Sequence, residues 1–249
     1  MLSLVDVKKY YKDNRAVDGI SFYVDNGEVL GLIGANGAGK STTISMIATL
    51  NLPDGGNIYY DGQDIVRHPA IMRNIMGYVP QEIALYPTLS GSDNLKFWGR
   101  ANHIRGRKLK QRINEVSGTV NLTEEVLKKK VSSYSGGMKR RLNIAAALLH
   151  EPKLVIMDEP TVGLDVESRN MILDTVIALK KQGTCIIYAG HYMEEMQRIC
   201  DKICVVDQGK SVLFGDMTDL LEKGNKSLEK LYLEVTQSRK NGGFADAKQ

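Results

Sequence analysis

The chain has 249 residues, of which 33 are Lys or Arg and 29 are Asp or Glu, so its formal net charge is +4. This length suits one large α/β domain with an inserted lobe, and the mild charge gives no electrostatic argument for a nucleic acid partner. No apolar run approaches the roughly 18 residues that span a bilayer, and no signal peptide opens the chain, so we expect a cytosolic protein without a membrane span of its own.

The first part of the chain is predicted to contain strands. Residues 1 to about 30 show alternating polar and apolar positions, most clearly over Ile20–Val24. Residues 55–62 have the pattern of a further strand between turn signals.

A glycine-rich loop with the pattern GxxxxGK[ST] follows the apolar run Val29–Ile33, which we interpret as a buried parallel strand. A helix is predicted to begin beyond the loop, over residues 41–48. Glycines let backbone N–H groups approach phosphate oxygens, and the helix N-terminus adds about half a positive charge beneath them. Lys40 is expected to supply a full charge to the β- and γ-phosphates, and Ser41 a hydroxyl for Mg²⁺. The predicted phosphate-binding residues are Gly34, Asn36, Gly37, Ala38, Gly39, Lys40, Ser41 and Thr42.

The middle of the chain, from about residue 89 to residue 150, has a helical pattern. One helix face is marked by Leu109, Ile113, Val116 and Val120. Ser135 stands ahead of an amphipathic helix, where a serine is an ordinary N-cap. The doubled glycine that follows, Gly136 and Gly137, indicates a backbone that lies close to an anionic group.

Two acidic residues end the apolar strand predicted at residues 153–157. Because ligands of α/β sheets collect outside the carboxyl ends of the strands, Asp158 and Glu159 are expected to face the phosphates. Strand alternation would point the two side chains apart, so we expect them to have different roles. Without a phosphate loop in the chain, an acidic turn after a core strand would be the better interpretation.

Three further polar residues lie in loops after predicted strands. Gln81 follows a short strand, where it could either take part in the phosphate site or be an ordinary solvated loop residue. His191 follows the apolar strand predicted at residues 184–189, where it could either take part in the phosphate site or cap the next helix. Asp165 lies in a glycine-containing loop, where an aspartate is usually the cap of the helix that follows.

The last part of the chain is predicted to form a hairpin over residues 202–213, with its turn at residues 207–210. The cysteines Cys185, Cys200 and Cys204 are odd in number and lack a metal-binding spacing, so we expect reduced thiols.

The order of three motifs is the most informative feature of the chain. The phosphate loop, the later element Tyr134-Ser135-Gly136-Gly137-Met138 and the pair Asp158-Glu159 together resemble an ATP-binding-cassette (ABC) ATPase, from about Leu2 to about Thr236. The resemblance implies an α/β fold of the P-loop NTPase (RecA-like) type, with a mostly parallel sheet, an N-terminal antiparallel β subdomain and an inserted α-helical lobe. It assigns residues 1–236 to the ATPase domain and about residues 89–150 to the lobe. Residues 237–249 are polar and contain glycine, so we expect them to form a disordered tail.

The resemblance also implies roles for the polar residues. Tyr11 has the place of an aromatic that stacks on adenine, although the adjacent Tyr10 could do so instead. Asp158 would orient the Mg²⁺ shell through water, and Glu159 would polarise the attacking water. Gln81 would reach the metal and sense the γ-phosphate.

Three of the implied roles concern the γ-phosphate or a second subunit. His191 would contact the γ-phosphate, although Ala189-Gly190 before it depart from the hydroxylated residue commonly seen there. Ser135, Gly136 and Gly137 would contact the γ-phosphate of ATP held by the opposite subunit, in the form YSGGM rather than the commoner LSGGQ. Asp165 would link one catalytic site to the other.

Residues 85–95, 191–196 and 227–233 resemble separate ATP-binding subunits of ABC-2-type exporters, a branch that expels drugs, sodium ions, lipids or polysaccharides. That branch implies ATP and Mg²⁺ as cofactors, a second ABC ATPase subunit, with a homodimer expected, and an ABC-2-type permease on a separate chain. The subunit is then expected at the inner face of the cell membrane, held there by the permease.

A docking surface for the permease is expected in the loop after Gln81. Its apolar residues Leu85, Tyr86, Pro87 and Leu89 have no periodic core pattern, although they could also pack the base of the helical lobe. The alternative function for the whole chain is a soluble, non-transport ABC ATPase that acts as an ATP-driven clamp on nucleic acid or ribosomes.

Overall fold

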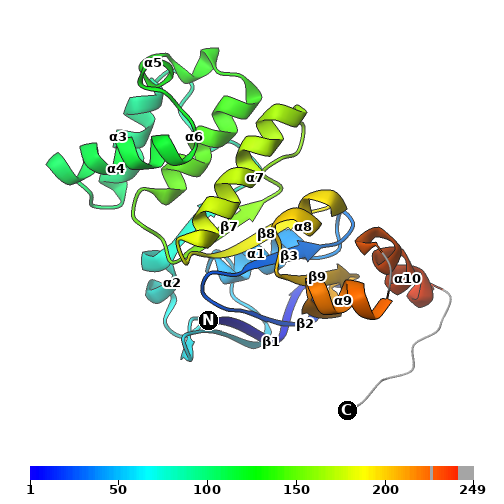
Figure 1. Cartoon of the computed structure of the whole chain (residues 1–249). Helices are drawn as coiled ribbons and strands as arrows, with labels where there is room; N and C mark the ends of the chain where they lie inside the picture. The colour runs from blue at the N-terminus through cyan, green and yellow to red at the C-terminus, as the bar shows by residue number, and fades with distance from the viewer. Residues whose placement is uncertain (225–226, 241–249) are drawn as a thin grey trace.

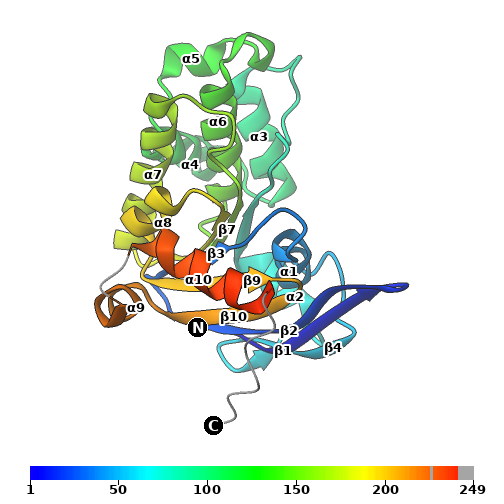
Figure 2. The same cartoon turned by 90° about the vertical axis from the view of Figure 1, so that its right-hand side faces the viewer.

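The computed structural model describes residues 1–224 and 227–240. It has two β-sheets with helices around them, and a separate group of helices at one end of the molecule (Figure 1). In the view of Figure 2 that group stands above the sheets, on the side away from the N-terminus.

The smaller sheet is antiparallel and has the strand order β2-β1-β4-β5. Its strands are β1 (Leu2–Tyr11), β2 (Asn14–Val24), β4 (Gly55–Tyr60) and β5 (Gln63–Asp64). Along β2, Ile20, Phe22 and Val24 are buried whereas Ser21 and Tyr23 are exposed. This alternation is what a strand with one face on a core requires. The predicted antiparallel β subdomain is confirmed.

The larger sheet has the order β10-β9-β3-β8-β7-β6, and all its pairs are parallel except β10 with β9. Its strands are β3 (Val29–Ile33), β6 (Met76–Val79), β7 (Leu154–Asp158), β8 (Cys185–Gly190), β9 (Lys202–Asp207) and β10 (Lys210–Asp216). Every residue of β3, β7 and β8 is buried, as expected for central strands covered on both faces. The predicted mostly parallel core is confirmed.

The two faces of the larger sheet bury different elements. Leu30 and Leu32 pack with α1 (Lys40–Ile47) and the smaller sheet, whereas Val29 and Ile33 belong to a core shared with α7 (Val166–Lys181) and α8 (Met193–Ile199). Because successive strand side chains point to opposite faces, one short strand contributes to both cores. The three cysteines are buried free thiols, as predicted.

The inserted lobe contains α3 (Gly91–Ala101), α4 (Gly106–Thr119), α5 (Glu124–Lys128) and α6 (Gly136–Leu148). The apolar face predicted from Leu109, Ile113, Val116 and Val120 is buried. The other described α-helices are α2 (Pro69–Ile75), α9 (Met217–Gly224) and α10 (Leu228–Lys240). Within the ranges that the structure describes, no helix is long and apolar enough to cross a membrane.

Helix α10 changes the boundary expected for the tail. It continues through Lys240, so residues 237–240 are helical, and residues 241–249 lie outside the described residues. Gln, Arg and Lys are good helix formers, so the polar composition of this stretch is as compatible with a helix end as with disorder.

The predicted hairpin joins β9 to β10 through Gln208 and Gly209. Both residues have positive φ angles, 47° and 77°, which is the geometry of a two-residue type I′ turn. The Gly209 N–H donates to the Ala38 carbonyl at 2.8 Å, and the Gly209 carbonyl accepts from the Asp18 N–H at 2.7 Å. The turn therefore links the smaller sheet to the glycine-rich loop.

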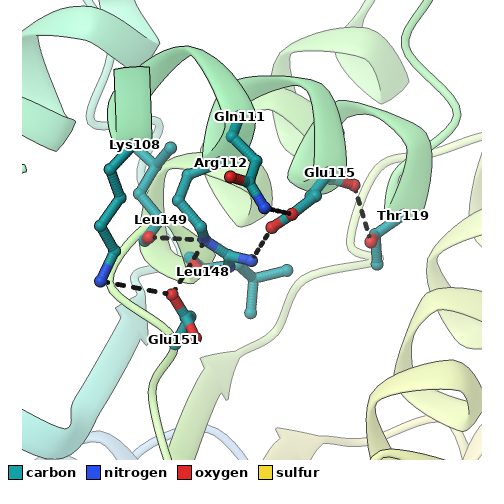
Figure 3. A network of polar contacts seen from close by, with 8 residues as sticks. All are labelled: Lys108, Gln111, Arg112, Glu115, Thr119, Leu148, Leu149 and Glu151. Atoms are coloured by element: carbon teal, nitrogen blue, oxygen red, sulfur yellow. Dashed lines mark hydrogen bonds and ion pairs between the residues drawn. The ribbon is translucent and has the colours of Figure 1, made fainter. Parts of the chain in front are cut away.

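Arg112 of α4 holds the end of α6 in place (Figure 3). Its Nε donates to the Leu149 carbonyl at 3.0 Å and its Nη2 donates to the Leu148 carbonyl at 2.9 Å. It also pairs with Glu115 and lies 3.6 Å from Glu151. The last carbonyls of a helix lack intrahelical partners and carry partial negative charge, so a cation is favoured there. This contact fixes α6 against α4.

Replacing Arg112 by Met should lower the free energy of unfolding by about 1–3 kcal/mol, because two partly buried carbonyls lose a charged donor while the packing of the stem is kept. Lys108→Met is the matched control, since its ion pair with Glu151 is long, 3.8 Å, and exposed. We expect that control to change stability by less than about 0.5 kcal/mol. Urea unfolding followed by circular dichroism measures both, and equal losses would contradict the assignment.

Candidate nucleotide-binding and hydrolysis site

The glycine-rich loop connects β3 to α1 and is pressed against neighbouring backbone. Gly39 has a φ of 111°, and a Cβ there would lie 2.6 Å from the Ala16 carbonyl oxygen. At Gly34 a Cβ would lie 2.3 Å from the Val206 carbonyl oxygen. Helix α1 begins at Lys40 with no side-chain cap and no acid in its first turn, so its own side chains do not compete for its first N–H groups.

Lys40 is held inside the curve of this loop. It is 5% exposed, and its Nζ donates to the carbonyls of Gly34 (2.7 Å) and Ala35 (3.1 Å). Nζ also lies 3.9 Å from Oε1 of Glu159. Burial lowers the pKa of Lys40 below its usual value, and the charges of Glu159 and Asp158 oppose that shift. The ammonium is thus surrounded by groups that accept its hydrogen bonds and balance its charge.

Asp158, the last residue of β7, is buried and is hydrogen-bonded by the Ser41 side chain. Burial raises the pKa of its carboxyl above the usual value and the Glu159 charge adds to this, whereas the Ser41 hydrogen bond and the Lys40 charge lower it. Its Oδ1 has no hydrogen-bond partner within the described ranges. A buried, unpartnered carboxylate oxygen beside a hydroxyl suits a hard cation such as Mg²⁺.

Side-chain carboxylates and imidazoles would not hold such an ion alone. In the part of the chain that the structure describes, no group of three or more His, Cys, Asp or Glu is placed to bind a metal. Mg²⁺ commonly combines one or two protein oxygens with waters and substrate phosphates. The pair Ser41 and Asp158 fits that kind of site.

Glu159 is the residue around which the other polar groups gather. Its carboxylate lies 3.5 Å from Nδ1 of His191, 3.4 Å from Nε2 of Gln81 and 3.9 Å from Nζ of Lys40. Its φ is 47°, and its N–H donates to the Ala189 carbonyl at 3.0 Å. The direction of the Glu159 side chain is therefore set by a left-handed backbone conformation. The strand alternation expected from the sequence does not set it. Such strain in a non-glycine residue is often found at functional sites.

Gln81 and His191 reach Glu159 from two other strand ends. β6 ends two residues before Gln81, and β8 ends one residue before His191. Tyr192, not His191, occupies the N-cap position of α8, so the capping alternative for the histidine is wrong. The His191 side chain is 41% exposed, which leaves it accessible to a ligand.

A hollow of about 450 Å³ lies beside the loop. It is lined by Tyr11, Asn14, Ala16, Asn36, Gly37, Gly39, Lys40, Ser41, Thr42, Gln81 and Glu159. Tyr11 is 44% exposed at this hollow, whereas the Tyr10 hydroxyl is hydrogen-bonded to Asp18 at 3.1 Å. The geometry favours Tyr11 over Tyr10 as the aromatic that would meet a base.

Sequence reasoning missed Asn14 and Ala16 in this lining. Both lie on β2 just after the turn that follows Tyr11, and Asn14 pairs with Tyr11 across that turn. Their place beside the loop is evident only from the pairing of β1 with β2. A larger hollow of about 880 Å³ lies between α3, α4 and α5 and contains none of the predicted site residues, so size does not identify the site.

Ser135 and Asp165 do not line the hollow of their own chain. Ser135 is the N-cap of α6, and its Oγ accepts from the Met138 N–H at 3.2 Å. Asp165 is the N-cap of α7 and accepts from the N–H and the hydroxyl of Ser168 at 2.8 and 2.9 Å. Both capping alternatives are therefore confirmed.

The two helix starts lie side by side. A Cβ on Gly137 would lie 2.1 Å from Oγ of Ser168, so this glycine is required for the contact between α6 and α7. A Cβ on Gly136 would lie 3.5 Å from the Leu164 side chain, next to Asp165. The element after Ser135 and the loop before α7 thus form one surface.

Arg140 is a further residue that sequence reasoning missed. It is buried, and its guanidinium donates to the Pro80 carbonyl at 2.8 Å and to the Gln81 carbonyl at 2.7 Å. The available signal was its helical spacing from the buried residues Gly137 and Ile144, which places a cation on the inward face of α6. Arg140 ties α6 to the loop that carries Gln81.

The model of the ABC transporter family matches residues 17–162, more than half of the chain. The linearmycin resistance ATP-binding protein LnrL of Bacillus subtilis (strain 168) is 50% identical over 223 residues, which cover 90% of this chain and 71% of that protein. The daunorubicin resistance ATP-binding protein DrrA3 of Streptomyces coeruleorubidus is 37% identical over 231 residues, 92% of this chain and 73% of that protein. A solved ATP-binding subunit of an ABC transporter superimposes with a TM-score of 0.84 at 30% identity, over 95% of this chain and 99% of that one. The chain therefore belongs to the ABC transporter family.

Proposed function

We propose that this chain is the ATP-binding and ATP-hydrolysing subunit of an exporter whose membrane-spanning part is a separate polypeptide. The observation that carries the proposal is the set of contacts around Glu159, whose carboxylate gathers Lys40, Gln81 and His191 at the end of the phosphate loop. Membership of the ABC transporter family and relatives named for resistance to linearmycin and daunorubicin support the export role.

Binding of the nucleotide falls to the phosphate loop and Tyr11. Lys40 exchanges its hydrogen bonds to the Gly34 and Ala35 carbonyls for phosphate oxygens, while the first N–H groups of α1 add partial positive charge. Tyr11, which lines the same hollow, presents an aromatic face to adenine.

Mg²⁺ would be held by Ser41, Gln81 and, through water, Asp158. When bound, Mg²⁺ would neutralise part of the negative charge of the phosphates. The unpartnered Oδ1 of Asp158 supports this assignment, because buried carboxylate oxygens are rarely left without a partner.

Hydrolysis depends on Glu159 and His191. Glu159 accepts a proton from the attacking water, a role in which a positioned base is typically worth about 10² to 10⁴ in rate. The 3.5 Å contact with His191 keeps the imidazole beside the carboxylate, and its exposure lets it reach the γ-phosphate. Lys40 stabilises the charge that develops on the phosphate oxygens.

Two copies of the chain are proposed to close around ATP as a homodimer. Ser135, Gly136 and Gly137 of one copy would meet the γ-phosphate held by the other, and Asp165 would cross the same interface. Two observations support this: these residues do not line their own chain's hollow, and they lie together on one surface.

The partner in the membrane is proposed to be an ABC-2-type permease, which would hold this subunit at the inner face of the membrane. Tyr86 and Leu89, at 45% and 37% exposure, lie in the loop after Gln81, whereas Leu85 is half-buried and packs on the core. Asn94 holds the Tyr86 backbone with hydrogen bonds of 2.8 and 3.0 Å. The loop therefore presents its exposed apolar side chains from a rigid backbone.

A hollow of about 170 Å³ lies between the lobe and β6, and Ala84 of the loop after Gln81 lines it. Trp98, Asn143 and His150 line it, and the atoms Nε1, Nδ2 and Nδ1 of these side chains are buried without hydrogen-bond partners among the described residues.

Replacing Glu159 by Gln should trap ATP and hold two copies together, because the amide keeps the size of the carboxylate but does not accept the proton of water. Sedimentation velocity of the purified variant should show a dimer with MgATP and a monomer with MgADP. A variant that binds nucleotide yet stays monomeric at every ATP concentration, with the permease also present, would contradict dimer closure.

Adding Ser135→Arg to that variant should abolish the dimer and leave nucleotide binding nearly intact, because the serine acts on the opposite copy. Thr123→Arg is the matched control: Thr123 caps α5, so it also removes a helix cap from the lobe. That control should still dimerise.

Binding and chemistry should separate by residue. Lys40→Ala should weaken both nucleotide affinity and turnover, since it removes the charge on the phosphates. His191→Ala should reduce turnover with a smaller loss of affinity, because its partner is the γ-phosphate at the moment of transfer. Fluorescent-nucleotide titration and phosphate release measure the two effects. His68→Ala, an exposed histidine ahead of α2, should change neither, and equal affinity losses in the Lys40 and His191 variants would count against these roles.

Tyr86→Ala should leave basal ATPase activity close to normal and weaken capture by a permease encoded in a neighbouring gene, because it removes the most exposed apolar side chain of the docking loop. Leu52→Ala, at an exposed leucine in the loop after α1, is the control and should not affect capture. Normal assembly and transport with Tyr86→Ala would refute the docking assignment. Absence of such a permease, with RNA or DNA co-purifying, would favour the clamp instead.

A further inference from the structure

Glu195 is a buried acid outside the nucleotide site. Within residues 1–224 and 227–240, the buried carboxylic acids are Asp158, Glu159 and Glu195, and Glu195 is 4% exposed. The first two face the phosphate loop, whereas Glu195 lies on α8. Burying a carboxylate costs several kcal/mol unless partners compensate, and an apolar residue would often be as good or better for stability. The position of Glu195 is therefore not explained by packing alone.

Glu195 joins three segments that surround the hydrolysis site. Its Oε2 accepts hydrogen bonds from the hydroxyls of Thr161 and Tyr188, both at 2.7 Å. Its Oε1 lies 3.3 Å from Nε of Arg169. Thr161 follows Glu159 by two residues, Tyr188 is on β8 ahead of the histidine turn, and Arg169 lies near the start of α7.

The same contacts close into a ring through the histidine. The Arg169 guanidinium lies 4.9 Å from the centre of the Tyr192 ring, and the rings of Tyr192 and His191 are 4.3 Å apart. His191 in turn contacts Glu159 at 3.5 Å. A path of contacts therefore runs from Glu159 through the loop to Glu195, then through Arg169 and Tyr192 to His191, and back to Glu159.

We propose that Glu195 is a positioning residue for ATP hydrolysis, which holds the loop of Glu159 and the turn of His191 in one arrangement. The inference rests on the proposed hydrolytic function of this site. Hydrogen bonds to a carboxylate in a buried environment are strong. The two that Oε2 accepts hold Glu195 to Thr161 and Tyr188, while Oε1 forms an ion pair with Arg169 and no hydrogen bond in the described part of the chain. Arg169 lies one helical turn after Asp165, the N-cap of α7, and its backbone N–H donates to the Asp165 carbonyl at 3.0 Å, as in any α-helix.

The neighbouring tyrosine is suited to its part in the ring. Burial, together with the adjacent charge of Glu195, raises the pKa of Tyr188 well above its usual value. The hydroxyl stays protonated at neutral pH and remains a donor to the carboxylate.

Thr161→Val tests the proposal with a side chain of nearly the same shape that lacks the hydroxyl. We expect kcat for ATP to fall at least about 10-fold while KM stays within about 2-fold, since small misplacements at a reacting centre cost up to about 100-fold in rate. Thr161→Ser restores the donor and should recover most of the wild-type kcat. Glu195→Gln should also lower kcat, as Thr161→Val does.

Arg198→Met is the matched control, because Arg198 also joins α8 to α7 but outside the ring, through Asn170 at 2.6 Å and Asp174 at 2.7 Å. We expect wild-type kcat for it. Unchanged kcat in Thr161→Val, no recovery in Thr161→Ser, or an equal loss in Arg198→Met would overturn the proposal.

A second measurement separates this proposal from the proposed function. In ¹⁵N-histidine-labelled protein, the imidazole signals of His191 should shift in Thr161→Val and stay unchanged in Arg198→Met, with the assignment made by His191→Ala. This holds whether or not the wild type hydrolyses ATP. A wild type without ATPase activity would refute the proposed function, whereas unshifted His191 signals in Thr161→Val would refute the positioning role.

Discussion

Parallel pairing of β3, β8, β7 and β6 is the constraint on which the rest of the structure depends. The pairs Ile33 with Gly190, Asp158 with Ala189 and Val79 with Met157 bring the carboxyl ends of these strands to one edge. Loops that follow parallel strands must leave from the same side of the sheet. The phosphate loop, the two acids, the glutamine and the histidine therefore meet although long stretches of chain separate them.

The same edge carries charges that a protein interior ordinarily excludes. Lys40, Asp158 and Glu159 are each less than 10% exposed. Isolated, each would cost several kcal/mol, but one ammonium between two carboxylates, with further hydrogen bonds, offsets much of that cost. Two acids and one base leave a single negative charge beside a phosphate loop. This arrangement of charges suits a ligand that binds together with a divalent cation. Removing one of the three charged side chains should be more harmful than removing all of them, because it leaves a buried charge without its partner.

The helical lobe is coupled to this edge through backbone carbonyls. Arg140 binds the carbonyls of Pro80 and Gln81 at one end of α6, and Arg112 binds the carbonyls at its other end. Helix α6 is therefore fixed to the loop that carries Gln81. A helix tied to a loop in this way is the kind of element that can convert a small local shift into a larger movement.

The sequence by itself determined the strands, the glycine-rich loop, the amphipathic helices and the family, because alternation, helical spacing and turn chemistry are local and the motif order is specific. It also identified most of the polar residues at the edge of the sheet, since each follows a strand. The tertiary structure alone decided the left-handed turn at Glu159, the carbonyl partners of Arg140 and the ring through Glu195. These features arise from contacts between segments far apart in the chain, so no local pattern encodes them.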